Sequence, residues 1–231
     1  MNQTSTTNRN KAKQLFGLTE EHISALPHSS SYQLHTSVIE PFLALQNAAH
    51  SQGIDIQIAS SFRSFERQLT IWNNKFHGKR PVYDRSNNLV NMSELSEWQK
   101  VQAILTFSAL PGASRHHWGT DIDIYDGNAL PENYQLQLTP EEYSKTGVFA
   151  KLVEWLPDNL NEFGFYQPYL ATNMGIAQEL WHISYQPIAK EFAKQFTSTP
   201  EQLLDVLSRY EIAGYETIAQ HFDQILHTFV Y

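Results

Sequence analysis

The chain contains no cysteine. Disulfide bridges, thiolate metal ligands and a cysteine nucleophile are therefore excluded, and any metal ion has to be held by imidazole and carboxylate groups. The absence of cysteine fits the cytosol and the periplasm equally well, so it does not decide the compartment.

Long apolar runs are absent as well. No stretch approaches the ~18 apolar residues that a membrane span needs. The polar residues 1–17 are not followed by an apolar segment of signal-peptide length. The sequence as written therefore predicts a cytoplasmic protein without a membrane span, and the cell envelope stays open if another export route exists.

Positive charge is scarce, because 16 lysines and arginines stand against 24 aspartates and glutamates, for a formal net charge of −8. This balance disfavours nucleic acid and anionic membranes as partners, although it permits a local basic pocket. We find no internal repeat and no low-complexity linker. A chain of 231 residues can bury the core of one domain, with or without a small appendage.

Apolar spacing predicts the order of the elements. Helices are expected at 36–51, 64–76, 93–110 and 148–163, and strands at 54–59, 120–125 and 180–185. From residue 188 the pattern is helical, with a break at 197–200. The expected class is α+β, with a small antiparallel central sheet flanked by helices. The expected organisation is an N-terminal arm (1–30), a main domain (31–196) and a helical C-terminal extension packed on it (197–231).

Two distant segments, residues 114–123 and 179–182, together supply the ligand types of a catalytic zinc site. They contain His116, Asp123 and His182, and they leave Glu179 as a spare carboxylate. A catalytic zinc site needs three protein ligands, an open position for water and a base that accepts a proton from that water. These residues predict a zinc hydrolase.

The same segments resemble the zinc D-alanyl-D-alanine carboxypeptidases and dipeptidases of the VanY and VanX type. That family carries Ser-x-His-x-x-Gly-x-Ala-x-Asp, which Ser114, His116, Gly119 and Asp123 match. It later carries Glu-x-x-His, matched at 179–182, and an earlier Ser-Gly-Tyr-Arg-Ser-x-x-x-Gln segment, which residues 61–68 resemble. The three motifs occur in the family's order, and the resemblance covers roughly residues 35–190. Asp121 departs from the family's alanine, and Leu180 replaces a common proline.

The resemblance implies a role for each matching residue. His116, Asp123 and His182 would hold zinc, and Glu179 would act as the general base. Arg63 would stabilise the scissile carbonyl oxygen as negative charge develops on it. Ser114 and Gln68 are candidates for contacting the carboxylate or the backbone of the substrate.

Two further residues of this segment lie near the motif histidine, His116. Asp121 is suited to accept a hydrogen bond from the outer nitrogen of a ligand histidine. His117 is expected to have a supporting or substrate-contacting role at most.

The implied activity is removal of a C-terminal D-alanine from a peptidoglycan stem peptide or muropeptide. The same site would also serve a D-Ala-D-Ala dipeptidase or an L-Ala–D-Glu endopeptidase. A zinc-stabilised binding module without catalysis is the alternative from another class. The presence of both Glu179 and Arg63 disfavours that alternative, because a binding module needs neither residue.

Overall fold

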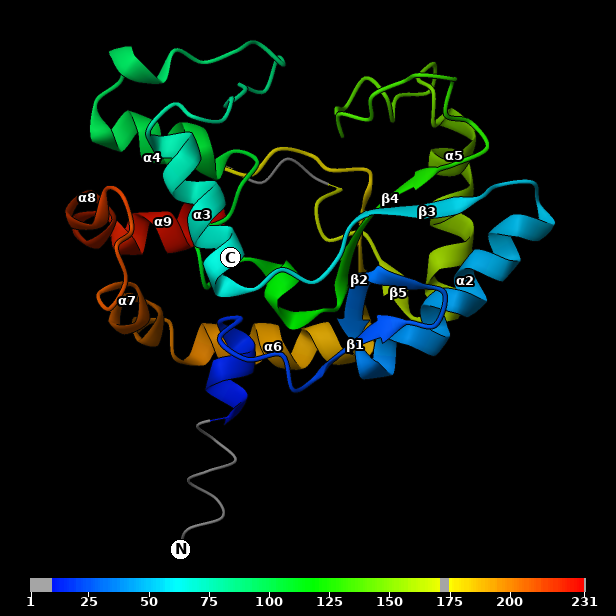
Figure 1. Ribbon diagram of the computed structural model, residues 1–231, viewed down its shortest axis with the longest axis horizontal. Coiled ribbons are helices and arrows are strands. Elements are labelled where there is room, and N and C mark those ends of the chain that lie inside the picture. Colours follow the sequence, from blue (N-terminus) through cyan, green and yellow to red (C-terminus); the bar gives the residue numbers. More distant parts are fainter. Residues whose placement is uncertain (1–9, 171–174, 231) are drawn as a thin grey trace, which may run out of the picture.

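The computed structural model describes residues 10–170 and 175–230. Strands and helices are interspersed along the chain (Figure 1). Their order is β1 (Ile23–Leu26), β2 (Ser29–His35), η1 (Thr36–Val38), α2 (Ile39–Ser51), β3 (Ile56–Ser60), α3 (Phe65–Phe76), η2 (Met92–Glu94), α4 (Glu97–Leu105), η3 (Arg115–Trp118), β4 (Asp121–Asp126), α5 (Ala150–Asn159), η4 (Leu160–Phe163), β5 (Phe165–Tyr166), β6 (His182–Tyr185), α6 (Gln186–Ser198), α7 (Glu201–Leu207), α8 (Tyr215–Gln220) and α9 (Phe222–Phe229).

The central sheet has four antiparallel strands in the order β3-β4-β6-β5. Ile122 of β4 pairs with Ile183 of β6, and both are fully buried in the core on one face. Because side chains alternate along a strand, Asp121 and Asp123 lie on the opposite face of β4. A separate two-stranded sheet is formed by β1 and β2. The expected α+β class with a small antiparallel sheet is confirmed.

The helix expected at 93–110 is shorter in the structure, where α4 covers Glu97–Leu105. Ser96 and Gln99 form a capping box, in which each side chain bonds the other residue's backbone N–H. Such a box satisfies backbone donors that the first helical turn leaves unpaired, so it determines where α4 begins.

The described part of the expected N-terminal arm is packed against the rest of the molecule. Residues 10–15 are helical, and Leu15 and Phe16 are buried in the core. The Trp118 indole N–H donates to the carbonyl of Leu15 at 3.2 Å. Strand β1 and the start of β2 also fall within this stretch. Residues 1–9 of the expected arm lie outside the described residues.

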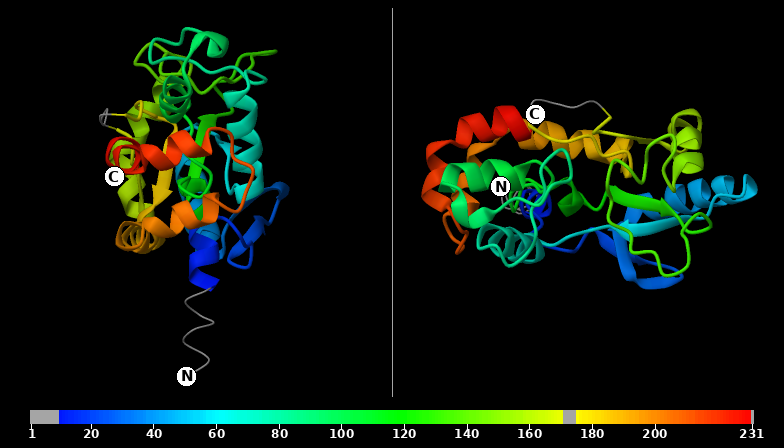
Figure 2. Two further views of the ribbon diagram at one scale, coloured as in Figure 1. Left: turned by 90° about the vertical axis from the view of Figure 1, so that its left-hand side faces the viewer. Right: turned by 90° about the horizontal axis from the view of Figure 1, so that it is seen from above.

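Two hydrophobic cores lie side by side. One contains α3, α4 and the helices from α6 onward, and the other contains the central sheet with α2 and α5. In Figure 1 the first group lies on the left and the second on the right, and the view from above in Figure 2 shows the same division. Helix α6 runs along the lower side of the molecule in Figure 1 and buries its apolar side chains in the first core.

A cleft of about 660 Å³ lies between the two groups and takes side chains from both. The loop after α3 and the loop after β4 contribute residues 80–87 and 135–140 to its walls. Both loops extend from the upper side of the molecule in Figure 1. Over the described ranges, no helix combines the length and the apolar character that a membrane crossing requires.

Candidate metal centre

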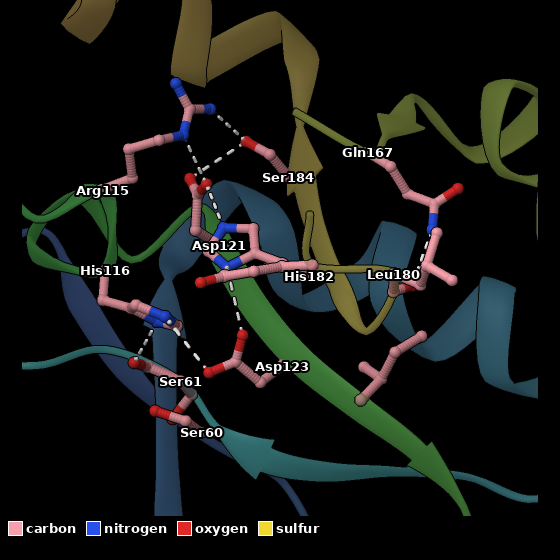
Figure 3. Close-up of polar contacts among 12 residues, drawn as sticks. Ser60, Ser61, Arg115, His116, Asp121, Asp123, Gln167, Leu180, His182 and Ser184 are labelled. Atoms are coloured by element: carbon pink, nitrogen blue, oxygen red, sulfur yellow. Dashed lines mark hydrogen bonds and ion pairs between the residues drawn. The ribbon is translucent and has the colours of Figure 1, made fainter. Parts of the chain in front are cut away.

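Three buried side chains with metal-ligating groups converge at one end of this cleft. His116, Asp123 and His182 each offer a ligand atom, and these atoms all lie within 4.8 Å of one another. Nε2 of His116 is 3.3 Å from one carboxylate oxygen of Asp123, and Nδ1 of His182 is 3.1 Å from the other. Figure 3 shows the two imidazoles on either side of the Asp123 carboxylate.

The sheet brings two of these residues together, because Asp123 of β4 and His182 of β6 are direct partners in the antiparallel register. His116 comes from η3, which ends at Gly119 with a φ of +68° and leads into β4. A β-carbon on Gly119 would lie 2.6 Å from the backbone nitrogen of His35 and would collide with Ile23. Glycine is therefore required where η3 turns beneath the β1–β2 sheet.

The outer nitrogen of each histidine is already hydrogen-bonded. Nδ1 of His116 lies 2.9 Å from the carbonyl of Ser61, and Nε2 of His182 lies 2.8 Å from Oδ1 of Asp121. Because these acceptors carry no proton, the outer nitrogens are the donors. When each ring is neutral, Nε2 of His116 and Nδ1 of His182 carry lone pairs that point inward, which is the orientation that a metal ligand needs.

Asp121 is itself firmly held. Its carboxylate accepts hydrogen bonds from Arg115 Nε at 2.7 Å, Thr120 Oγ1 at 2.6 Å and Ser184 Oγ at 2.9 Å. The expectation that Asp121 bonds a ligand-type histidine agrees with this geometry. The bond to His182 runs on the side away from Asp123 (Figure 3).

The donor set fits a cation. Oδ1 of Asp123 and Nδ1 of His182 are buried and make no hydrogen bond among the described residues, although they face each other. Burial alone raises the pKa of Asp123, but His116 and His182 hold it well below its usual range, so the carboxylate is ionised. Unpaired buried groups of this kind are costly, and a cation coordinated between them would remove that cost.

Burial and the neighbouring carboxylates also set the protonation of the two histidines. Burial lowers the pKa of His116 and favours the neutral imidazole that binds metals. Burial also disfavours a charged His182, but Asp121, which accepts a hydrogen bond from its Nε2, and the charge of the adjacent Asp123 outweigh burial and raise the pKa of His182 to about 10. The two aspartates thus require a positive charge, and a metal ion would replace the proton on His182.

Glu179 lies in the segment just before β6, three residues ahead of His182. Its Oε2 is 3.5 Å from the inward nitrogen of His182, and the peptide N–H of His182 donates to the Glu179 carbonyl. Burial raises the pKa of Glu179 to about 7, and the charge of Asp123 adds to this. A carboxyl group with such a pKa can both accept and release a proton near neutral pH.

Arg63 lines the same cleft. Its guanidinium donates to Oε1 of Gln68 at 2.7 Å and to Oγ of Ser60 at 3.0 Å. Gln68 has no exposed surface, and its amide nitrogen donates to the carbonyl of Ala109 at 2.7 Å. The structure therefore places Gln68 behind Arg63, as a support for the guanidinium, and not in the cleft where a substrate would touch it.

Of the other two residues named from the sequence, Ser114 precedes η3 and His117 lies within it. Ser114 also lines the cleft. His117 is fully buried, and its Nε2 accepts from the Gly112 N–H at 2.9 Å. Its Nδ1 then donates to the carbonyl of Arg63, so His117 fixes the backbone that carries the guanidinium.

Sequence reasoning missed several neighbours of the centre. Tyr169 stacks edge-on against His182, with ring centroids 4.9 Å apart, and Arg115 forms the ion pair with Asp121. Lys75 and Arg80 line the cleft from α3 and from the loop that follows it. The only signal for Arg115 was its place inside the histidine motif.

Comparison with known proteins gives three findings. A sequence model described as VanY, D-alanyl-D-alanine carboxypeptidase, matches residues 31–188. An uncharacterized protein of Haemophilus influenzae is 39% identical over 127 residues, which cover 54% of this chain and 95% of that protein. A second uncharacterized Haemophilus influenzae protein is 48% identical over 98 residues, covering 42% of this chain and 67% of the relative.

Solved structures share the fold. A vancomycin-resistance D,D-pentapeptidase VanY variant in complex with Zn(II) superposes with a TM-score of 0.52 at 22% identity, covering 75% of this chain and 85% of that one. VanYB in complex with D-alanine-D-alanine gives 0.52 at 20% identity over 83% and 93%. The LdcB LD-carboxypeptidase gives 0.51 at 19% identity over 78% and 74%.

Proposed function

Because the chain belongs to the VanY family of D-alanyl-D-alanine carboxypeptidases, we propose that it is a zinc-dependent carboxypeptidase that removes a C-terminal D-alanine from peptidoglycan stem peptides. His116, Asp123 and His182 hold the metal ion. Glu179 is the general base, and Arg63 stabilises the oxyanion.

One observation carries the proposal. A buried carboxyl group that is not needed as a ligand, that of Glu179, lies 3.5 Å from the inward nitrogen of a ligand-type histidine. A purely structural zinc site uses four protein ligands and has no need of a base beside it. Related structures with Zn(II) and with D-alanine-D-alanine support the choice of metal and of substrate class.

The chemistry then divides among the side chains. A zinc ion at this position supplies Lewis-acid activation of a water molecule. Glu179 accepts a proton from the water and passes it to the nitrogen of the departing D-alanine. The Arg63 guanidinium donates hydrogen bonds to the carbonyl oxygen as charge develops there. Gln68 and Ser60 hold that guanidinium in place before the substrate arrives.

The test is incubation of the zinc-loaded protein with defined muropeptides, followed by mass spectrometry of the products. Release of D-alanine from a pentapeptide, abolished by a chelator and restored by zinc, is the expected result. Cleavage between L-alanine and D-glutamate would instead identify an endopeptidase, and release of the dipeptide D-Ala-D-Ala would identify a dipeptidase. Absence of any zinc-dependent cleavage would refute a catalytic function.

A single substitution tests the base. Glu179→Gln should keep zinc affinity and lower kcat by about 10²- to 10⁴-fold, because proton transfer is lost while the ligands remain. Glu162→Gln, an equal change at an exposed position of η4, is the matched control and should leave kcat unchanged. If Glu179→Gln hydrolysed the peptide at the unmodified rate, Glu179 would not be the base.

A further inference from the structure

The loop between β4 and α5 forms one wall of the cleft, although part of it has no regular structure (Figure 1). Residues 135–139 line the cleft, and this stretch is neither helix nor strand. The partly buried side chains of Leu136 and Leu138 pack against the core of the central sheet. A loop without a backbone ladder is ordinarily the most mobile part of a fold. The shape of this wall therefore depends on side chains that hold the loop.

Glu142 supplies that support with both of its carboxylate oxygens. Oε1 accepts a hydrogen bond from the Tyr134 hydroxyl at 2.9 Å and another from the Gln137 N–H at 3.0 Å. Oε2 accepts from the Thr139 N–H at 3.0 Å. The residue is only 5% exposed, so water competes little for these bonds, and bonds to a carboxylate are stronger than neutral ones. One side chain thus ties together residues spread along the 134–139 loop.

The middle of the loop shows why such ties are needed. Leu138 has a φ of +57°, a left-handed conformation that is rare and costly for a residue with a bulky side chain. The backbone N–H groups on either side of it, those of Gln137 and Thr139, are the two that Glu142 binds. A strained residue persists only where its surroundings determine it. The carboxylate of Glu142 therefore keeps this part of the wall in one shape.

The support is itself tied to the strands of the metal centre. Tyr143, the residue after Glu142, is fully buried, and its hydroxyl donates to the carbonyl of Ile124 in β4 at 2.7 Å. Its ring lies against Trp181, with the ring centroids 5.3 Å apart. Ile124 and Trp181 are the chain neighbours of two of the proposed metal ligands. The wall is thus placed relative to the metal centre through Glu142 and Tyr143.

We propose that Glu142 is a positioning residue for substrate binding, which holds the 134–139 loop in the shape that receives the peptide. This inference rests on the proposed function and adds a determinant of substrate affinity to it. Glu142 does not itself line the cleft, so it acts through the loop. The metal ligands, Glu179 and Arg63 come from other segments of the chain. Without Glu142 the peptide has to order the loop as it binds, which weakens binding and leaves the chemical step intact.

The first experiment measures KM and kcat of zinc-loaded Glu142→Gln for release of D-alanine from a stem pentapeptide. Glutamine has the same size, but its amide NH₂ cannot accept a hydrogen bond, so at least one of the three bonds is lost. KM should rise about tenfold, the worth of one hydrogen bond to a charged group. The value of kcat should stay within about twofold, because only uniform binding is removed.

Glu141→Gln makes the same change at the exposed neighbouring position and should alter neither constant. Tyr134→Phe removes one of the three bonds and keeps the ring, so it should raise KM in the same direction and by less. It also tests the proposal if Glu142→Gln does not fold. A lower kcat at an unchanged KM would show that Glu142 only stabilises the fold, and it would overturn the positioning role. An unchanged KM in Tyr134→Phe would overturn it as well.

Calorimetric binding of the pentapeptide to the zinc-loaded Glu179→Gln protein separates this role from the proposed function. An affinity that falls about tenfold on adding Glu142→Gln supports the positioning role even if the unmodified protein does not hydrolyse the peptide. In that case the proposed function fails alone. Equal affinities with and without Glu142→Gln, or no binding to either protein, overturn the positioning role whatever the hydrolytic activity.

Discussion

Asp121 is one of the two residues at which this chain departs from its family's motifs, and its contacts explain why the change is tolerated. An extra carboxylate beside Asp123 would repel it, but Arg115 pairs with Asp121 at 2.7 Å and cancels its charge. The Arg115 guanidinium also donates to Ser184 and Tyr166 and stacks over Trp118. The pair therefore adds a rigid acceptor behind His182 without adding net charge to the centre.

Asp121→Ala should weaken zinc binding about 10- to 100-fold, because His182 loses the acceptor that fixes its ring and its tautomer. Competition with a chromophoric chelator measures this affinity. Asp121→Asn keeps an acceptor of the same shape and serves as a control for misfolding. Its zinc affinity should lie between those of the unmodified protein and Asp121→Ala. Asp126→Asn alters an equally buried aspartate at the far end of β4 and should leave zinc affinity as it was. Unchanged affinity in Asp121→Ala would contradict the assigned role.

At the scale of elements, the sequence predicted the strands in which apolar and polar residues alternate. The strands expected at 54–59, 120–125 and 180–185 are present as β3, β4 and β6, because apolar alternation marks a strand with one buried face. Strands β1, β2 and β5 were missed. Residues 29–33 of β2 are almost entirely polar, and β5 has only two residues. Neither strand therefore shows the alternation of apolar and polar residues that predicts a strand.

Only those residues of the candidate site that lie within short sequence motifs could be predicted. His116, Asp123, His182 and Glu179 sit in two short segments, and their convergence follows from the pairing of β4 with β6. The positions of Lys75 and Tyr169 depend on how a helix end and a loop pack against distant strands. No local pattern encodes such packing, so these neighbours became visible only in the fold.

The residue just before β1, His22, should make the fold sensitive to acid. His22 is buried among the rings of His35, Phe62 and Phe192, and both of its ring nitrogens lack hydrogen-bond partners among the described residues. Burial lowers its pKa from 6.5 to about 4, and His35 adds to this. Glu21 and the backbone of His117 oppose the shift only in part.

The sign of the effect follows from proton uptake. Above pH 6.5 His22 is neutral in both states and has no influence on stability. Between pH 6.5 and 4 the unfolded chain binds a proton at His22 that the folded chain does not bind. The free energy of unfolding therefore decreases as the pH is lowered through this range. His22→Phe should remove about 2 kcal/mol of this loss at pH 4, as measured by urea unfolding at several pH values. His50→Phe, at an exposed position, should keep the unmodified slope, and an equally steep slope in His22→Phe would contradict the assignment.

At the scale of the whole molecule, the cleft exists because two cores meet along it. The strands supply Asp123 and His182 from one side, and the end of α3 supplies Lys75 from the other. The last helices belong to the same group as α3, since α7, α8 and α9 bury apolar side chains against α3 and α4. Trp72 of α3 donates its indole N–H to the Ala213 carbonyl at 3.0 Å. The expected C-terminal extension thus packs against α3 and contributes to the same side of the cleft.

Removal of residues 200–231 should therefore disturb both stability and the cleft. It exposes the core around α3 and deletes Phe229 and Val230 from the cleft lining. We expect the truncated chain to lose its cooperative urea transition. A truncated chain can also aggregate without reporting on this contact, so Ile225→Ala tests the contact in the full chain. This substitution should lower the free energy of unfolding by about 2 to 5 kcal/mol. Leu89→Ala, at a position 68% exposed, should change it by less than about 0.5 kcal/mol. A truncated chain that unfolds cooperatively and hydrolyses peptide at the full rate would show that the last helices are dispensable, and would limit the cleft wall to residues before 200.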